Sequence, residues 1–64
     1  MSLKSVLYAN KVVISQVHKN ILDLVFNQEF YFDDIERIAL QKMYGHVVKL
    51  EVLISEIDKR KGDN

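Results

Sequence analysis

The segment Asn27–Asp34, with the sequence NQEFYFDD, separates two long stretches of helical periodicity and thereby decides the fold. Near its end, Asp33 followed by Glu36 matches a capping box, in which two side chains satisfy the free backbone amides of a starting helix. Asp34 adds negative charge where the helix dipole is positive. We therefore expect a helix to begin at about Asp34 and the preceding segment to be the connection.

The residues before this segment, from about Leu3 to about Asn27, have the apolar spacing of one amphipathic helix. The β-branched run Val12–Ile14 raises the alternative of a strand, but helical periodicity continues on both sides of it. Additional valines flank the main spacing, and such a wide apolar stripe is typical of a helix that faces more than one neighbour. The predicted seam of this helix comprises Leu3, Leu7, Asn10, Ile14, Val17, Ile21, Leu24 and Gln28.

The residues after the segment, from about Asp34 to about Arg60, have the same character and predict a second helix. Gly45 lies inside it, and a glycine within a helix costs about 1 kcal/mol relative to alanine. A break at Gly45 is the alternative, but the apolar spacing keeps its phase across the glycine, which favours one continuous helix. Its predicted seam comprises Ala39, Met43, His46, Leu50, Leu53 and Ile57.

Two helices of similar length joined by a short segment fold back on each other, so residues 1–64 are predicted to be one all-α domain, an antiparallel helical hairpin. A chain this short buries only roughly 60% of its surface, and without cysteine it has no disulfide or zinc-thiolate site to stabilise it. The wide stripes would leave an apolar trough that monomers rarely expose. We therefore predict that two hairpins pair as a homodimer and form a four-helix bundle with coiled-coil packing.

Nine Lys and Arg residues balance nine Asp and Glu residues, so the formal net charge is zero. This balance argues against a dedicated nucleic-acid binder, which normally carries a basic surface, and against a polybasic membrane anchor. No apolar run approaches the roughly 18 residues of a membrane span, and Met1–Lys4 lacks the order of a signal peptide. Since the chain has no cysteine, we expect a cytoplasmic protein without a membrane partner.

The sequence contains no recognisable catalytic, cofactor or metal site. If the connection is centred on Phe30 and Tyr31, residue i of the first helix faces residue 61−i of the second, which places His18 opposite Met43. Neither His18 nor His46 has a second ligand at i+4, so no metal site is predicted. The serines lack the glycine-flanked elbow of a nucleophile, and no glycine-rich phosphate loop occurs. We therefore expect a protein that is not an enzyme and that holds no cofactor.

Three adjacent aromatic residues, Phe30, Tyr31 and Phe32, cannot all point into a core made by two helices. One or two of them would close the end of the bundle, and at least one is a candidate anchor for a partner, because aromatic residues dominate interface hot spots. Tyr8 and Tyr44, expected on the flanks of the helices, would extend this surface. The predicted function is that of a small protein-protein interaction protein: a regulator, inhibitor, adaptor or assembly subunit, of the size common among phage and mobile-element accessory proteins.

The alternative is a dimeric regulator that binds RNA or DNA through lysines. Lys4, Lys11 and Lys19 recur at spacings of seven and eight residues and therefore line one side of the first helix. Such a stripe could contact phosphates. A solvated charged face is the simpler interpretation, because the aromatic residues that would stack on bases lie elsewhere in the sequence.

Overall fold

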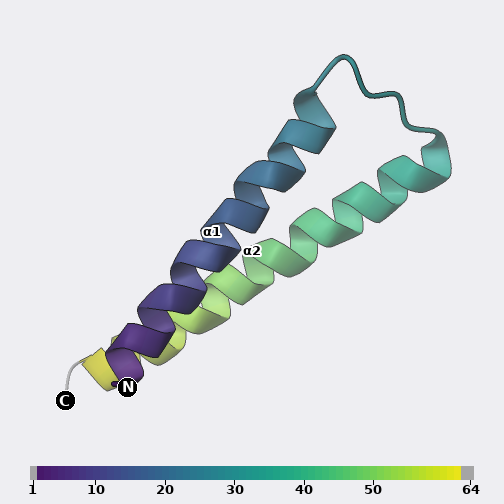
Figure 1. The fold of residues 1–64 in the computed structure, drawn as a ribbon. Coiled ribbons are helices and arrows are strands. Elements are labelled where there is room, and N and C mark those ends of the chain that lie inside the picture. Colours follow the sequence, from purple (N-terminus) through teal and green to yellow (C-terminus); the bar gives the residue numbers. More distant parts are fainter. Residues whose placement is uncertain (1, 63–64) are drawn as a thin grey trace.

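The structure, a computed structural model, describes residues 2–62 as two α-helices that form an antiparallel hairpin (Figure 1). Helix α1 spans Leu3–Phe26 and α2 spans Asp34–Gly62, with residues 27–33 connecting them. Both sets of bounds agree with the sequence prediction to within two residues, and the all-α hairpin is confirmed. Neither helix contains a stretch that is both long and apolar enough for a membrane span.

Side-chain caps determine both ends of α1. At its start, the Ser2 hydroxyl accepts a hydrogen bond from the backbone N–H of Ser5 at 3.1 Å. At its end, the N–H of Asn27 still donates to the carbonyl of Asp23 at 3.0 Å, while the Asn27 side-chain oxygen accepts from the N–H of Glu29 at 2.9 Å. Asn27 therefore turns the chain out of the helix, because its side chain offers the backbone a local alternative to the helical bond.

The capping box predicted at the start of α2 is confirmed. The N–H of Glu36 donates to Asp33 Oδ1 at 2.8 Å, and the N–H of Asp33 donates to Glu36 Oε1 at 3.0 Å. The N–H of Arg37 donates to the carbonyl of Asp33 at 2.9 Å and begins the helical ladder. These reciprocal bonds determine where the connection ends and α2 begins.

Both helices are continuous through the positions where the sequence left an alternative open. Helix α1 includes Val12–Ile14, so the strand is excluded there, and α2 includes Gly45, so the alternative of two shorter helices is wrong. Gly45 does not have a positive φ, and a Cβ added there would meet no atom within 4 Å. Gly45 therefore neither forms a turn nor allows a close approach between α1 and α2. Packing on both sides of it offsets its low helix propensity.

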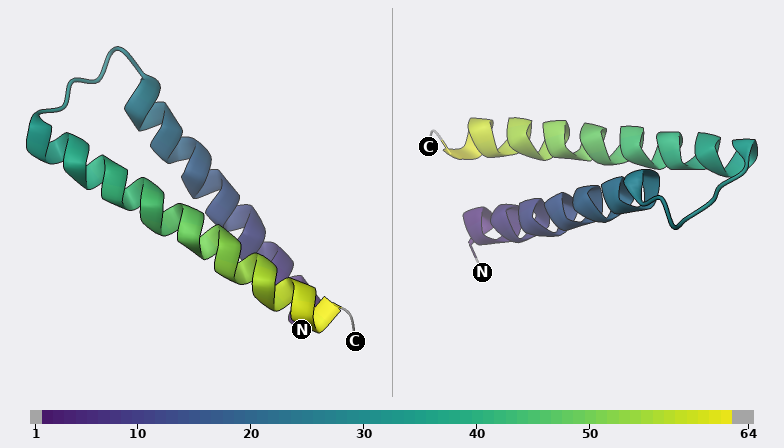
Figure 2. Two further views of the ribbon diagram at one scale, coloured as in Figure 1. Left: turned by 180° about the vertical axis from the view of Figure 1, so that it is seen from behind. Right: turned by 90° about the horizontal axis from the view of Figure 1, so that it is seen from above.

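The two helices cross at an angle. In Figure 1 the two helices overlap near the start of α1 and the end of α2 and separate toward the connection. In the view from above in Figure 2, they are farthest apart near the start of α1 and come together near its end. Such a crossing allows two helices to interdigitate their side chains along a common line. The molecule is a rod of 47 × 17 × 15 Å with the connection at one end.

Two polar pairs between the helices establish their register. Lys11 pairs with Asp58 and His18 pairs with Glu51, so in each pair the two residue numbers add up to 69. Residue i of α1 therefore lies level with residue 69−i of α2, and the expected 61−i, which placed His18 opposite Met43, is wrong. The reason is that the connection is not a tight turn. The first turns of α2 extend past the end of α1, as Figure 2 shows, and the connecting residues span the distance back.

The contact between α1 and α2 buries few side chains. Within residues 2–61, only Leu7, Ile21 and Val47 are less than a tenth exposed, and the most buried of them, Ile21, is 3% exposed. The hairpin by itself therefore has a narrow contact line and not a closed core. The half-buried side chains of this contact line are Lys11, Ile14, His18, Leu22, Leu24, Leu40, Val48, Glu51, Ile54 and Asp58.

The seams predicted from the sequence are only partly correct. On α1, the isoleucines of the seam face α2 as expected, whereas Asn10 and Val17 do not. On α2, every residue of the predicted seam is exposed, because the helix is turned by one residue relative to the expectation. The stripe one position further along α2 carries Glu51 and Asp58, whose carboxylates contact His18 and Lys11 of α1.

Candidate functional site

An apolar surface runs along the hairpin beside the contact line. Several residues that directly precede a contact residue are apolar and exposed: Val6 precedes Leu7 on α1, and Leu53 precedes Ile54 on α2. Polar residues at such positions are Asn10, Asn20, Asp23 and His46. The side chains of this surface are 39% to 61% exposed in the hairpin. We call it the apolar face, and it consists of Leu3, Val6, Val13, Val17, Met43, Leu50, Leu53 and Ile57.

Both helices contribute to the same side of the hairpin. One residue back along an α-helix is a rotation of about 100° around its axis. Because α1 and α2 run in opposite directions and stand on opposite sides of the contact line, this rotation moves both exposed stripes toward the same side. The exposed apolar residues of the two helices therefore lie on one side of the hairpin, and not on opposite sides.

The hairpin exposes more surface than a globular chain of the same mass. The accessible surface is 5541 Å², whereas a compact monomer of 7.5 kDa exposes about 4,200 Å² by the usual scaling with mass. The radius of gyration is 14.9 Å, against about 10.7 Å for a globular domain of this length. The hairpin thus exposes about 1,300 Å² more than a globular chain of its mass would.

The two polar pairs in the contact line determine which stripe faces outward. Lys11 Nζ lies 2.6 Å from Asp58 Oδ2, and His18 Nδ1 lies 2.6 Å from Glu51 Oε1. The Tyr44 ring packs edge-on against the His18 ring, with 5.2 Å between centroids. Polar pairs as exposed as these contribute only about 0–1 kcal/mol each. Instead, the two pairs select one rotation of each helix about its axis. Turning either helix by one residue would separate both pairs and bury the apolar face.

The two histidines differ in exposure: His18 is half-buried and His46 is exposed. His18 is paired with Glu51, and no hydroxyl within residues 2–62 hydrogen-bonds to its ring. His46 is exposed on the apolar side of α2. Among the residues that the structure describes, no three His, Cys, Asp or Glu side chains gather as metal ligands. His18 therefore belongs to the packing between the helices.

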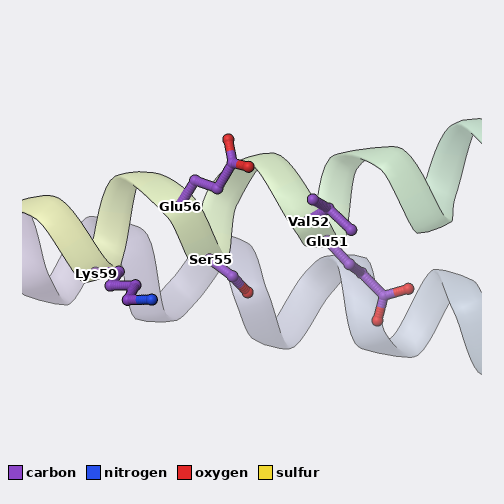
Figure 3. A pocket seen from close by; sticks show the side chains of 5 residues that line it. All are labelled: Glu51, Val52, Ser55, Glu56 and Lys59. Atoms are coloured by element: carbon purple, nitrogen blue, oxygen red, sulfur yellow. The ribbon is translucent and has the colours of Figure 1, made fainter.

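A shallow hollow on α2, drawn in Figure 3, has none of the features of a ligand site. Its lining side chains point in different directions, and none of them comes from α1. A ligand there would keep most of its surface in water, whereas small-molecule sites enclose most of the ligand. The residues that line this hollow are Glu51, Val52, Ser55, Glu56 and Lys59.

The lysine stripe that predicted a nucleic-acid face is interrupted in the structure. Lys11, its middle member, is paired with Asp58. Lys4 borders a shallow hollow together with this pair and Tyr8, while Lys19 is exposed further along α1. One of the three expected phosphate contacts is therefore neutralised by a carboxylate of α2.

Three of the five predicted partner-binding aromatic residues lie together at the connection. The rings of Phe30 and Phe32 are tilted with 6.4 Å between centroids, Phe32 is half-buried, and Tyr31 is 86% exposed. We call these three residues the aromatic turn. The structure does not bring the other two to it: Tyr8 lies level with the end of α2, and Tyr44 packs on a histidine ring of α1.

Two exposed apolar residues beside the aromatic turn were missed as candidate contact residues. Phe26, the last residue of α1, is 74% exposed, and Ile35, in the first turn of α2, is 79% exposed. Both residues are apolar but fall outside the predicted seams. Large apolar residues at positions that the helical spacing does not explain are the signal that could have identified them. The end of the rod is therefore more apolar than the aromatic turn alone.

Comparison with known protein families, with curated proteins and with solved structures finds no match to this chain. Its function is therefore inferred from its surfaces. The apolar face and the aromatic turn are both surfaces of the kind that proteins cover with other proteins.

Proposed function

We propose that this chain is a non-enzymatic protein-protein interaction protein whose apolar face is covered by another polypeptide. The observation that carries this proposal is the apolar face itself, with side chains 39% to 61% exposed along one side of a hairpin that has a narrow contact line. Monomeric proteins rarely leave apolar patches larger than a few hundred Å² in water. Covering such a strip contributes about 25 cal/mol for each Å² of apolar surface buried.

The occupant that fits this face best is a second hairpin, which gives a four-helix bundle. A standard interface buries about 800 Å² on each partner, and the surface excess of the single hairpin is about 1,300 Å². A second copy supplies a strip of the same length and apolar character, and zero net charge brings no overall repulsion between copies. Each helix would then face two neighbours, which accounts for the width of its apolar stripe.

Sedimentation equilibrium tests this pairing directly. At micromolar concentration we expect a species of twice the 7.5 kDa of one chain, because the apolar face is too large to stay hydrated. A dye that fluoresces on exposed apolar surfaces should bind weakly to the same sample. A species of 7.5 kDa that also binds the dye strongly would contradict the proposal, since the face would then be uncovered.

The aromatic turn is the surface that we assign to a further protein partner. It lies at the end of the rod and outside the apolar face, so it stays accessible when two hairpins pair. Exposed aromatic residues are typical anchors of protein interfaces. The acidic residues Glu29, Asp33 and Asp34 flank it, which favours a partner with a basic surface. A regulator, inhibitor, adaptor or assembly subunit would use such a turn in the same way.

Replacing two aromatic residues together, Phe30→Ala and Tyr31→Ala, is expected to abolish partner capture without unfolding the hairpin. Loss of a hot-spot aromatic costs at least about 2 kcal/mol, so the double variant should bind at least about 30-fold more weakly. The measurement is affinity capture from the native host, followed by titration of the captured partner. The control is Val12→Ala, at a site that is also exposed but lies on α1. Equal affinity of the wild type and the double variant would contradict this role of the turn.

A nucleic-acid-binding function has less support. Lys11 is neutralised by Asp58, the net charge is zero, and the aromatic turn lies at the end of the rod away from Lys4. Gel shifts at increasing salt separate the two functions. Binding that weakens steeply with salt, and that fails when Lys4 and Lys19 are replaced by glutamine, would favour nucleic acid over protein.

A further inference from the structure

We infer that proton uptake by His46 separates the two hairpins, so that their pairing is strong above neutral pH and weak in mild acid. This inference rests on the proposed pairing of two hairpins and adds its regulation. It holds for either orientation of the second copy. The observation that carries it is the position of His46, the one titratable side chain between Met43 and Ile57 at the helical spacing of the apolar face.

His46 lies within the stripe of α2 that belongs to the apolar face. It follows Met43 by three residues and precedes Leu50 by four, and residues at these spacings are neighbours on one side of a helix. All three side chains are exposed in the single hairpin, Met43 by 43% and Leu50 by 50%. A second hairpin that covers Met43 and Leu50 therefore also covers the imidazole between them, whichever way its connection points.

The matching positions of α1, from Leu3 to Val17, carry no titratable group. The polar residue among them is Asn10, whose side-chain amide donates to the carbonyl of Val6 at 2.8 Å. An amide has no charge to gain or lose, whereas histidine is the side chain that ordinarily changes its charge close to neutral pH. The covered surface of each copy thus contains a single pH-sensitive group, His46.

Among the described residues of the hairpin, no carboxylate faces His46. On α2, the residues four before and three after it are Lys42 and Lys49, and both are exposed. On α1, the charged residue at the same level is Asp23, since the two residue numbers add up to 69. Asp23 is about 200° around α1 from the buried Ile21 and therefore lies on the side away from α2. A proton on His46 thus adds a third positive charge beside two lysines.

The second copy brings no acidic partner to His46 either. Its apolar face consists of the same apolar residues and contains no carboxylate. The outer edge of its α2, next to that face, carries three exposed basic residues and one acidic residue: Lys42, Lys49, Glu56 and Arg60. Covering a protonated imidazole here removes its water and supplies no opposite charge, so that the charged form is disfavoured in the pair.

The direction of the effect follows from the protons bound before and after pairing. A hairpin with a proton on His46 must release it in order to pair, and each dimer has two such histidines. Where the imidazoles are already neutral, at high pH, pairing has its full strength. As pH falls through the range in which histidines titrate, the dissociation constant rises by up to about 100-fold per pH unit, which is tenfold for each proton released.

Sedimentation equilibrium at about pH 7.5 and about pH 5.5 tests this inference, since carboxyl groups ordinarily keep their charge over this range. We expect the dissociation constant of the wild type to rise at least about 30-fold between the two. In His46→Gln, whose side chain stays neutral, the change should be less than about threefold. The matched control is His18→Gln, which removes the histidine of the contact line and should keep the pH dependence of the wild type.

Each outcome of this measurement has a defined meaning. A wild-type dissociation constant that is the same at both pH values, or an equal rise in His46→Gln, would overturn the role of His46, while the proposed pairing of hairpins would stand. A species of 7.5 kDa at both pH values would overturn the pairing and its regulation together. Circular dichroism verifies that α1 and α2 stay helical in acid. A loss of helix content that accounts for the loss of pairing would also overturn the inference.

Discussion

Replacing Leu53 by glutamate is expected to abolish the pairing of hairpins and to leave each hairpin helical. Leu53 is 44% exposed in the single hairpin, so a glutamate there remains hydrated in the monomer. In the bundle, each copy would lose about 1.5–3 kcal/mol of apolar burial, and a carboxylate of each copy would be taken out of water. We therefore expect the dissociation constant, measured by sedimentation equilibrium, to rise at least about 1,000-fold.

The matched control for this variant is Val52→Glu. Val52 is the next residue of the same helix and is 52% exposed, but it lies away from the apolar face. The same charge at this position should leave the dissociation constant within about threefold of the wild type. If the two variants weakened pairing equally, the apolar face would not be the surface that carries the interaction.

Replacing Ile21 by alanine is expected to destabilise the hairpin itself. Ile21 is the most buried side chain of the contact line, at 3% exposed, and it lies level with Val47 and Val48 of α2. Truncating a buried isoleucine to alanine costs about 2–5 kcal/mol, and here few other buried side chains can compensate. We expect the free energy of unfolding to fall by about 3 kcal/mol in urea titrations followed by circular dichroism. Protein concentration must be held constant, because pairing contributes to the measured stability.

The control for this second variant is Val12→Ala. Val12 is on the same helix but is 50% exposed. Truncating it should change the free energy of unfolding by no more than about 0.5 kcal/mol. A comparable loss in both variants would show that Ile21 is not part of a packed contact between the helices.

Much of the fold was predictable from the sequence because it depends on neighbouring residues. The capping box of Asp33 and Glu36 joins residues three apart, and the start of α2 follows from it. The apolar spacing of α1 outweighed the strand propensity of Val12–Ile14 because it continues on both sides of that run. The continuity of α2 through Gly45 followed in the same way.

The candidate site was predicted less well. The aromatic turn was recognised, since three adjacent aromatic residues cannot share one small core. Leu53 was assigned instead to the seam between α1 and α2, and Tyr8 was grouped with aromatic residues at the other end of the rod. The first error comes from the rotation of α2, which apolar spacing does not specify when a stripe is wide enough to face two neighbours. The second was avoidable, because Tyr8 lies 18 residues before the end of α1, about 27 Å along the helix.

The sequence by itself determined two capped helices and apolar stripes too wide for a single contact. Only the tertiary structure decided which part of each stripe is covered and which is left outward. The physical reason is how far apart in the sequence the residues that make the deciding contacts are. Caps join residues two to four apart, whereas the pairs that set rotation and register join His18 to Glu51 and Lys11 to Asp58, which are 33 and 47 residues apart. Such pairs become visible only when the chain has folded back on itself.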